Sequence, residues 1–320
     1  MTKTLQLVTH NGPFHADDVF AAALLTRFSH GVTIQITRTR DEDVIRQADV
    51  VIDVGGVYDP ATLRFDHHQF RSVGERKRSR FMPAVPLSSA GMVLEHLVDS
   101  GKLSAEVGEI LYRDLIAEID LLDNGEGPAP APGFPQMGGL SKAVSRMNPN
   151  WDVGEKNFDA AFLKAVTWAK GVVRSAVSAA RAQVKARSLV EQATREAGGD
   201  VLVMNTAVPG ATEIALDLAG EDVKYIVQPS DFGGWMVLAV PPSRERRFEQ
   251  KVPLPANWAG LRGDDLNAKI IEADPTLREV LEYGSKVVPS AVFCHTGRFC
   301  CGHGTRDAAL IMACVAASRW

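Results

Sequence analysis

The stretch LQLVTHNGPFHADD, residues Leu5–Asp18, decides the fold. Its first five residues are apolar or favour extended structure, and they predict a buried strand that delivers His10 to its C-terminal end. A polar loop, Asn11–His15, follows, and from Asp17 to Phe28 apolar residues recur at helical spacing. A strand, a polar loop and a helix in this order predict an α/β domain.

Two further strands are predicted next along the chain. Val32–Ile36 alternates in polarity, and Val50–Val54 is short and continuously apolar, as in a parallel sheet whose two faces are covered. In open α/β sheets, ligands bind at the carboxyl ends of the strands. Since His10 and Asp53 fall at such ends, we expect the functional site at this edge of the sheet.

After residue 86 the predicted elements are first helices and a loop, then one long helix, and then short strands. Helices are predicted over residues 87–98 and 104–122, and four prolines make residues 127–139 a surface loop. Residues 158–196, rich in alanine and arginine, predict one long linker helix. Shorter elements then indicate a second α/β domain: strands at Val201–Met204, Val223–Val227 and Trp235–Val240, and a last helix at Thr305–Ala317.

Length and composition are those of an ordinary globular protein. With 320 residues, of which 45% are apolar, the chain is long enough for two domains. We predict a metal-binding catalytic domain in residues 1–150 with a parallel sheet covered by helices, a linker helix region in 151–197, and a second, smaller α/β domain in 198–320. The four cysteines form no Cys-x-x-Cys pair, so reduced thiols are expected.

Targeting and charge narrow the class of protein. The N-terminus shows no signal-peptide pattern, and no apolar run approaches the roughly 20 residues that a membrane helix needs. We therefore expect a cytoplasmic protein without a membrane partner. A net charge of −4 argues against a protein that coats nucleic acid with its whole surface, although a local basic patch remains compatible with phosphate binding.

Carboxylates and imidazoles gather at four places. A helix dipole would explain one acid near residue 17 but neither nearby histidine, and a lone carboxylate after a buried strand is costly without a partner. Carboxylate oxygens suit Mn²⁺ or Mg²⁺, and imidazoles shift the preference towards Mn²⁺. Seven or eight ligands suit two ions roughly 3.5–4 Å apart, which activate a water in phosphoester hydrolysis. The four places are His10–Asp18, Asp53, Asp66–His68, and Asp120 with Asp123.

These motifs resemble, in the same order, the four motifs of the DHH phosphoesterase superfamily. The fuller strings THNGPFHAD, residues 9–17, and VGGVYDP, residues 54–60, look like the melanocyte-proliferating-gene family, which is regarded as a family of 3′-to-5′ RNA exonucleases. Residues 140–151 and 253–262 also look familial, so the resemblance spans nearly the whole chain. It implies two divalent ions, one held by His10, His15 and Asp53 and the other by Asp17, Asp53, His67 and Asp123.

The same resemblance implies roles around the ions. His68 would face the scissile phosphate, and with Asp53 and His67 it would carry the catalysis. Asp66 would orient a histidine. Asp120 would replace Asp123 as a ligand or would support it, and these two alternatives stay open.

The segment from Cys301 to Arg306 resembles the Gly-Gly-Gly-His segment of the accessory domain in this superfamily. Glycines let the backbone approach a phosphate, and a helix that begins near Thr305 would point its amides at an anion. The resemblance implies that Gly302, His303 and Arg306 contact the substrate, and the alternative is a tight turn with a helix cap.

Two basic segments and two aromatic residues complete the candidates. Arg71–Arg80 and Arg244–Arg247 are expected to bind an RNA backbone if they lie beside a phosphoesterase site, and as a class such segments are solvated surface. Trp235 and Phe299 could stack on bases, but we interpret them as core residues.

We expect a metal-dependent phosphodiesterase that cleaves single-stranded RNA from its 3′ end. The nearest alternative is the same chemistry on a short oligonucleotide, a cyclic dinucleotide, a bisphosphonucleoside or pyrophosphate. Another alternative is a non-catalytic protein that binds RNA or metal through a degenerate site. The oligomeric state is left open by the sequence, a homodimer included.

Overall fold

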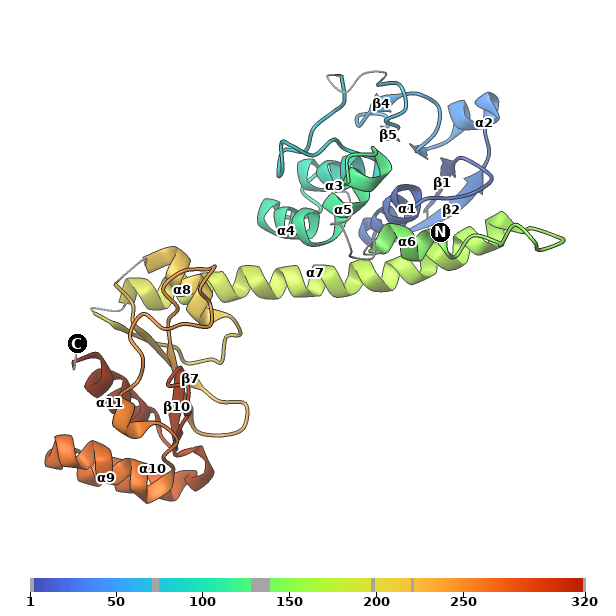
Figure 1. Ribbon diagram of the computed structural model, residues 1–320. Helices are drawn as coiled ribbons and strands as arrows, with labels where there is room; N and C mark the ends of the chain where they lie inside the picture. Colours follow the sequence, from blue (N-terminus) through green and yellow to red (C-terminus); the bar gives the residue numbers. More distant parts are fainter. Residues whose placement is uncertain (1–2, 71–74, 128–138, 197–198, 220–221, 319–320) are drawn as a thin grey trace. The chain divides into compact units, whose positions relative to one another are not determined.

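The computed structural model describes residues 3–70, 75–127, 139–196, 199–219 and 222–318. The chain forms two compact units, Met1–Ala182 and Gln183–Trp320, and each is built on a five-stranded sheet (Figure 1). This mixed α/β architecture confirms the predicted fold class, while the predicted domain limits at 150 and 197 stay a prediction. Among the described helices, none combines the length and the apolar character needed to cross a membrane.

The first sheet is parallel except at one edge. β1 lies between β2 and β3, and it pairs with β2 from Lys3 opposite Val32 to Thr9 opposite Arg38. The chain passes from β1 to β2 on one side and then to β3 on the other, so the strand order reverses between β1 and β3, the place where such sheets bind ligands. Across the sheet the strands are β2 (Val32–Arg38), β1 (Lys3–Thr9), β3 (Val50–Ile52), β5 (Arg64–Phe65) and the antiparallel β4 (Tyr58–Asp59).

Helices cover both faces of this sheet. Because parallel crossovers are right-handed, α1 (Ala16–Phe28) and α2 (Glu42–Gln47) fall on opposite faces. Ile45 of α2 packs on Val8 and Val51, while α1 is almost wholly buried. α1 packs against three further helices, α3 (Ser89–Asp99), α5 (Ala117–Asp123) and α6 (Leu140–Ser145).

The helix predicted over residues 104–122 is interrupted. α4 (Ala105–Leu111) and α5 are joined by a π-helical turn, η1 (Tyr112–Ile116), and α5 ends at Asp123 as predicted. A π turn holds more residues than an α turn, so it shifts the helical phase for all that follows. A regular helix over residues 104–122 would place Leu122 on one face with the buried Leu111, but Leu122 is 39% exposed.

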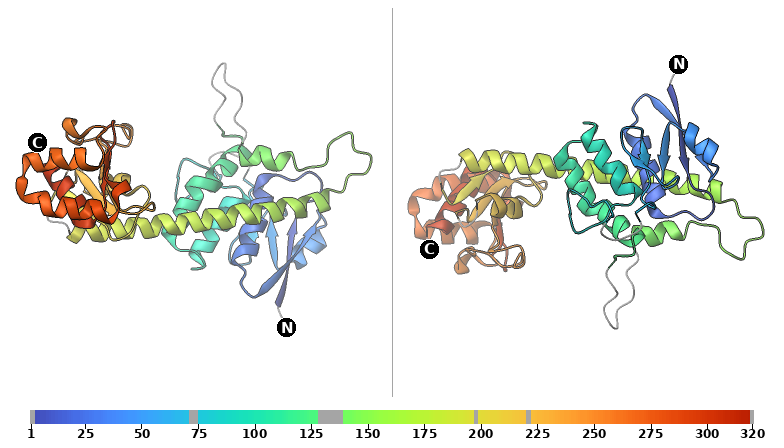
Figure 2. Two further views of the ribbon diagram at one scale, coloured as in Figure 1. Left: turned by 90° about the horizontal axis from the view of Figure 1, so that it is seen from below. Right: turned by 90° about the horizontal axis from the view of Figure 1, so that it is seen from above.

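α7 (Phe158–Glu196) has the predicted bounds and is one uninterrupted helix in every view (Figures 1 and 2). Its first turns pack into the first unit, where the ring of Phe162 lies 5.6 Å from that of Phe14, edge to face. Its last turns belong to a core cluster of the second unit, which includes Val190 and Leu202.

The second sheet is mostly antiparallel, and β6 with β7 is its parallel pair. α11 (Arg306–Ala317) packs on β7 and β8. Across this sheet the strands are β6 (Val201–Val203), β7 (Tyr225–Pro229), β8 (Trp235–Ala239), β10 (Cys300–His303) and β9 (Phe293–Cys294). The other elements are α8 (Ala211–Ala219), α9 (Gly263–Ala273), α10 (Arg278–Val287) and the short 3₁₀ turns Ala256–Trp258, Pro275–Leu277 and Pro289–Ala291.

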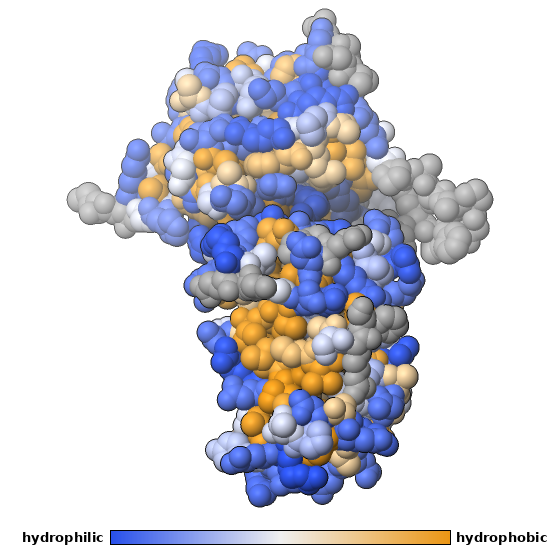
Figure 3. Space-filling view, turned by 90° about the vertical axis from the view of Figure 1, so that its left-hand side faces the viewer, coloured by the Kyte–Doolittle hydropathy of each residue, from blue (hydrophilic) through white to orange (hydrophobic). Residues whose placement is uncertain are grey.

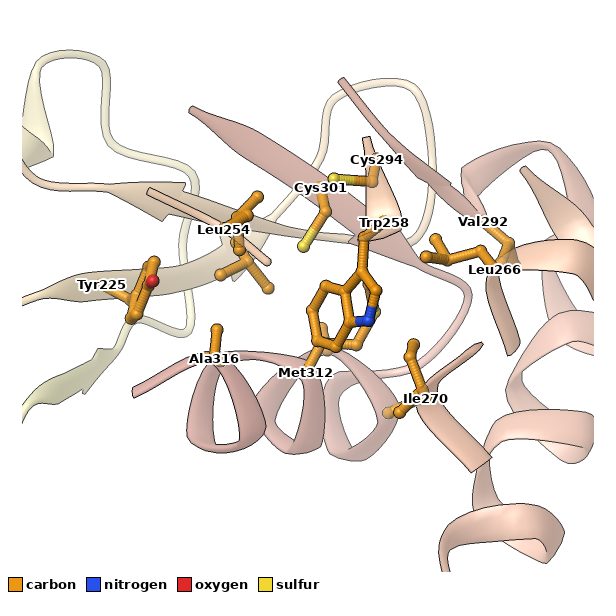
Figure 4. Close-up of a cluster of buried hydrophobic side chains, with 14 of the residues drawn as sticks. Tyr225, Leu254, Trp258, Leu266, Ile270, Val292, Cys294, Cys301, Met312 and Ala316 are labelled. Atoms are coloured by element: carbon orange, nitrogen blue, oxygen red, sulfur yellow. The ribbon is translucent and has the colours of Figure 1, made fainter. Parts of the chain in front are cut away.

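The core of the second unit is centred on Trp258, which is fully buried near the thiols of Cys294 and Cys301 (Figure 4). Both cysteines are free thiols. Partly buried side chains such as Leu310 and Val315 of α11 pack against this core from outside. Apolar residues therefore also reach the surface of this unit and form the orange patch in the lower half of Figure 3.

Candidate metal centre

The parallel strands of the first sheet deliver polar side chains to one edge. His10 follows β1, Asp53 follows β3, and Asp66 and His67 follow β5. Since the carboxyl ends of parallel strands lie together, residues that are far apart in the sequence meet here. The sequence-based expectation that His10 and Asp53 lie at one edge is consistent with this geometry.

Asp53 lies at the centre of the cluster. Its Oδ2 is 3.2 Å from Nε2 of His10, and its Oδ1 is 3.4 Å from Nε2 of His67. Burial alone would raise the pKa of Asp53, but the hydrogen bonds from these two imidazoles lower it below its ordinary value. Its φ angle of 52° lies in the left-handed region, which is unusual for aspartate and is found at functional sites. The two oxygens therefore face two different imidazoles, as a bridging ligand requires.

One group of candidate ligands combines His10, His15 and Asp53, whose ligand atoms lie within 4.8 Å of one another. His15 is exposed and occupies the N-cap of α1, and its ring centroid is 5.7 Å from that of His10. These are the three residues that the resemblance implied for the first ion.

A second group surrounds the imidazole of His67. Its Nε2 lies 3.1 Å from Oδ2 of Asp123, 3.4 Å from Oδ1 of Asp53 and 3.9 Å from Oδ2 of Asp17. Burial would lower the pKa of His67, but the hydrogen bonds to Asp123 and Asp53 raise it to about 10. The structure thus brings together the four residues that the resemblance implied for the second ion.

Several carboxylate oxygens in this cluster are buried without a donor. Asp17 is fully buried, and neither of its oxygens has a hydrogen-bond partner among the described residues. Burial and the neighbouring carboxylates of Asp53, Asp123 and Asp18 raise the pKa of Asp17 well above its ordinary value. Unpaired buried carboxylates are costly, and a divalent cation supplies both the charge and the bonds that these oxygens lack. The residues present therefore fit a metal centre.

Asp66 orients His68. Its Oδ1 lies 2.8 Å from Nδ1 of His68, and its Oδ2 accepts a hydrogen bond from the backbone N–H of Gly56 at 2.6 Å. The hydrogen bond that His68 donates to Asp66 raises the pKa of His68, whose side chain is 64% exposed. With Nδ1 engaged by Asp66, Nε2 of His68 is the nitrogen that remains for a ligand. His68 lines a cavity of about 300 Å³ together with His10, His15, Arg40 and Asp53.

Asp120 lies apart from these groups, in a pocket of donors. Its Oδ1 accepts hydrogen bonds from the Ser88 backbone N–H at 3.0 Å, the Ser88 hydroxyl at 2.6 Å and the Gly91 N–H at 3.2 Å. Its Oδ2 accepts one from the Tyr112 hydroxyl at 2.9 Å. Burial raises the pKa of Asp120 to about 7, and these donors act in the opposite direction. Asp120 therefore caps the first turn of α3, while Asp123 faces His67.

Sequence reasoning left two residues of this edge unassigned. Asp18 Oδ2 lies 3.3 Å from Nε2 of His10, and Asp18 Oδ1 accepts a hydrogen bond from the His15 N–H. The three-residue spacing from His15 to Asp18 is that of a capping box, which was the available signal. Arg40, two residues after the end of β2, lines the cavity. The feature of the sequence that could have indicated it is its place after a predicted strand.

The segment Cys301–Arg306, for which the resemblance implied substrate contacts, begins as a strand in the structure. Gly302 and His303 belong to strand β10, and a Cβ added at Gly302 would lie 2.7 Å from the carbonyl oxygen of Ala291. The glycine is explained by this close packing. His303 is fully buried, with Nε2 3.1 Å from Asn267 Oδ1, so of the three implied substrate contacts only Arg306 is exposed. This geometry does not support a substrate role for Gly302 or His303, because both are enclosed by their own unit.

The aromatic and basic candidates are also placed. Trp235 packs against the core as interpreted, but Phe299 is 44% exposed and lies 4.4 Å from the ring of His295. Five of the described basic residues in these segments are engaged in ion pairs, while Lys77 lies over the ring of Tyr58 and Arg247 over that of Phe248. The pairs are Arg76 and Arg78 with Glu126, Arg80 with Glu95 and Asp99, Arg244 with Asp217, and Arg246 with Glu249. Residues 71–74 and most of the predicted proline-rich loop, 128–138, lie outside the described residues.

Comparisons with known proteins give the family. The model of the "Uncharacterised protein family (UPF0160)", named MYG1_exonuc, matches residues 6–317. The chain is 30% identical to the "MYG1 exonuclease" of Homo sapiens over 95% of this chain and 84% of that protein. It is also 30% identical to "MYG1 protein C27H6.8" of Caenorhabditis elegans, over 95% and 93% of the two chains. The "MYG1 protein" of Chlamydia muridarum is 33% identical over 91% and 89%.

A solved structure, a "pGpG-specific phosphodiesterase" from Vibrio cholerae, aligns over 99% of this chain and 98% of its own. Its TM-score of 0.30 and identity of 12% are too low to carry an argument about fold or function. The sequence relatives and the family model together are decisive, and the chain belongs to the MYG1 family.

Proposed function

We propose that this protein is a metal-dependent phosphodiesterase that removes nucleotides from the 3′ end of single-stranded RNA. The observation that carries the proposal is the pair of ligand groups that share Asp53, one with His10 and His15 and the other with His67. The buried, donor-free oxygens of Asp17 support a cation there. Mixed carboxylate and imidazole ligands favour Mn²⁺ over Mg²⁺.

The ligand assignment follows the contacts. His10, His15 and Asp53 would hold one ion, and Asp17, Asp53, His67 and Asp123 the other. Asp123 is preferred to Asp120 because its carboxylate lies 3.1 Å from the His67 imidazole, whereas Asp120 is already bonded to four donors. A pair of such ions supplies Lewis-acid chemistry, which lowers the pKa of a bound water and stabilises charge on phosphate oxygens.

The chain itself contributes orientation and a proton. Asp66 fixes the ring of His68 through Nδ1 and raises the pKa of that imidazole, which favours its protonated form. A protonated His68 would donate a hydrogen bond through Nε2 to the phosphate or to the departing ribose oxygen. Catalysis is therefore assigned to Asp53, His67 and His68.

The substrate is proposed from similarity to other proteins and not from the geometry of the site. Four mammalian relatives carry the name "MYG1 exonuclease", which describes an enzyme that works from a chain end. RNA and the 3′-to-5′ direction are the finer parts of the proposal. They come from the resemblance of the sequence motifs.

The test uses protein that has been stripped of metal with a chelator and resupplied with Mn²⁺ or Mg²⁺. We expect a 5′-labelled single-stranded RNA to shorten stepwise from its 3′ end and to release mononucleotides. DNA of the same sequence, a linear dinucleotide, a cyclic dinucleotide and pyrophosphate are assayed in parallel, with Asp53→Ala as the inactive control. Shortening from the 5′ end would contradict the proposed polarity.

A second candidate keeps the chemistry and changes the substrate. The cavity of about 300 Å³ beside the site is at the lower end of the range for small-molecule pockets, which favours a single nucleotide or a dinucleotide over a long bound strand. Turnover of dinucleotides with none of long RNA would establish this alternative. Metal analysis that finds fewer than two ions, with no substrate hydrolysed, would instead indicate a non-catalytic binding protein.

A further inference from the structure

Arg40 occupies a position at the site that no catalytic role yet explains. It follows strand β2, which lies beside β1, and the backbone N–H of Thr39 donates to the carbonyl of Thr9 at 2.8 Å. The hydrogen bonding between the β1 and β2 segments thus continues past the ends of the strands. It holds residue 40 at the edge of the sheet that carries the candidate ligands. Its side chain lines the same cavity as His10, His15 and His68.

The guanidinium of Arg40 is anchored by one nitrogen. Nη1 donates to the backbone oxygen and to Oδ1 of Asn11, each at 2.6 Å. An arginine has five N–H donors in a rigid fork, so Nε and Nη2 are left for another acceptor. Asn11 directly follows His10, so this anchoring fixes the guanidinium relative to the first group of candidate ligands.

The charge of Arg40 is not neutralised by its anchor. Both acceptors on Asn11 are neutral, and within the described ranges no carboxylate lies within ion-pair distance of Arg40. Its neighbour Arg38, by contrast, is paired with Asp159 at 3.1 Å. A fixed, uncompensated cation beside a cavity is suited to bind an anion, and the planar guanidinium matches a phosphate with two parallel hydrogen bonds.

We propose that Arg40 determines specificity by binding a second phosphate of the substrate, next to the one that is cleaved. This inference rests on the proposed phosphodiesterase function. The guanidinium is held on Asn11, directly after the candidate ligand His10, so it lies beside the ligand groups that would take the cleaved phosphate and faces the same cavity. Arg40 therefore selects substrates that carry at least two phosphates in sequence.

The test compares two substrates in Mn²⁺. Bis(p-nitrophenyl) phosphate has one phosphate, and a single-stranded RNA trimer with a 5′-phosphate has several. We expect Arg40→Ala to lower kcat/KM for the RNA by about tenfold to a hundredfold, mostly through KM, because a charge-assisted hydrogen bond is lost. Hydrolysis of bis(p-nitrophenyl) phosphate should change less than about twofold.

Two further variants control the comparison. Arg46→Ala removes an exposed arginine of α2 that is paired with Asp43, and it should leave both substrates unaffected. Arg40→Lys keeps the charge without the fork and should recover part of the loss. Thermal unfolding of all three variants checks that the fold is retained.

The outcomes separate this inference from the proposed function. Equal losses on both substrates, or no loss on either, would overturn the role of Arg40 and leave the phosphodiesterase function intact. If wild-type protein hydrolyses neither substrate, the proposed function fails. The role of Arg40 is then tested by the binding of a fluorescein-labelled phosphorothioate RNA trimer in Ca²⁺. Weaker binding by Arg40→Ala than by Arg46→Ala would support the phosphate contact, and equal binding would contradict it.

Discussion

Two buried acidic regions of the first unit differ in what surrounds them. Asp120 receives hydrogen bonds from four donors of the protein. Asp17 is equally buried, yet its oxygens have no donor among the described residues and face the carboxylates of Asp53 and Asp123. The protein supplies donors to the first carboxylate, whereas the second lacks donors and is suited to bind a cation. The comparison teaches that burial alone does not mark a functional acid, whereas burial without donors does.

The largest expected effect is on catalysis. Asp53→Ala or His67→Ala should reduce RNA hydrolysis in Mn²⁺ to background. Asp53 is the candidate ligand that the two groups share, and His67 is the imidazole around which the second group is built. The fold should survive, as judged by circular dichroism, since neither side chain caps a helix. Asp43→Ala, an exposed acid of α2, is the matched control. Wild-type turnover in either site variant would refute the site assignment.

Substitutions at Asp120 and Asp123, three residues apart, test directly the difference between an acid with donors and an acid near the candidate ligands. Asp120→Asn should lower the free energy of unfolding by roughly 1–3 kcal/mol, because the amide keeps one acceptor oxygen and presents an N–H₂ group in place of the oxygen that accepts from the Tyr112 hydroxyl. Its kcat per folded molecule should change little. Asp123→Asn should do the reverse, with stability retained and activity lost.

Urea denaturation and steady-state assays on the same samples measure both quantities for this pair. If Asp120→Asn were stable and inactive, Asp120 would be the ligand and the interpretation of its four donors would be wrong. The pair therefore decides between the two alternatives that the sequence motifs leave open.

Metal should stabilise the region that lacks donors. At a concentration of Mn²⁺ one hundred times its Kd, the folded protein gains roughly 2.7 kcal/mol, seen as a rise in Tm. Asp17→Asn should abolish most of this rise and should be more stable than wild type when both are metal-free, since it removes a buried, crowded charge. A full Mn²⁺ shift in the variant would exclude Asp17 from the centre.

The comparison extends to a buried imidazole of the second unit. Burial lowers the pKa of His303 to about 4, below its ordinary value of 6.5, so the unfolded chain binds a proton that the folded one excludes. This contribution to stability is complete above pH 6.5 and is lost as the pH falls towards 4.

Between pH 7 and pH 5 the loss for His303 should be about 2 kcal/mol. Hydrogen exchange of peptides that cover residues 293–303 measures it locally, and His303→Gln is the non-titrating control. An identical pH response in wild type and variant would show that His303 is not held neutral.

The smallest expected effect tests one donor of Asp120. Tyr112→Phe removes a single hydrogen bond to Oδ2 while the ring remains, so the free energy of unfolding should fall by about 1 kcal/mol with kcat unchanged. A change in kcat without a change in stability would mean that the π-helical turn positions Asp123.

Much of the fold was predictable because its signals are local. Strand β1, helix α1 and helix α7 follow from the period of their apolar residues, and α7 has the predicted bounds. The π turn at Tyr112 was not predicted, because the apolar period of residues 104–122 carries no signal for it. The strand at Gly302 was not predicted either, since its pairing with β8 depends on residues more than 60 positions away.

The candidate site shows the same limit. Residue types at strand ends indicated His10 and Asp53, but a sequence does not tell which acid is supplied with donors. Asp120 and Asp123 are both plausible ligands until Ser88, Gly91 and Tyr112 are seen around the first of them. Arg40 was missed because a single arginine carries no motif, and its role depends on what surrounds it in space.

The backbone of Asp53 sets a conflict between durability and catalysis at one residue. With φ at 52°, the position would suit glycine better than aspartate, but glycine would remove the carboxylate that we propose as the shared metal ligand. Random mutagenesis selected only for heat resistance should therefore accumulate glycine or asparagine at position 53 and yield sturdier, inactive protein. If aspartate is retained at position 53 under selection for activity, the strained backbone there is required for activity.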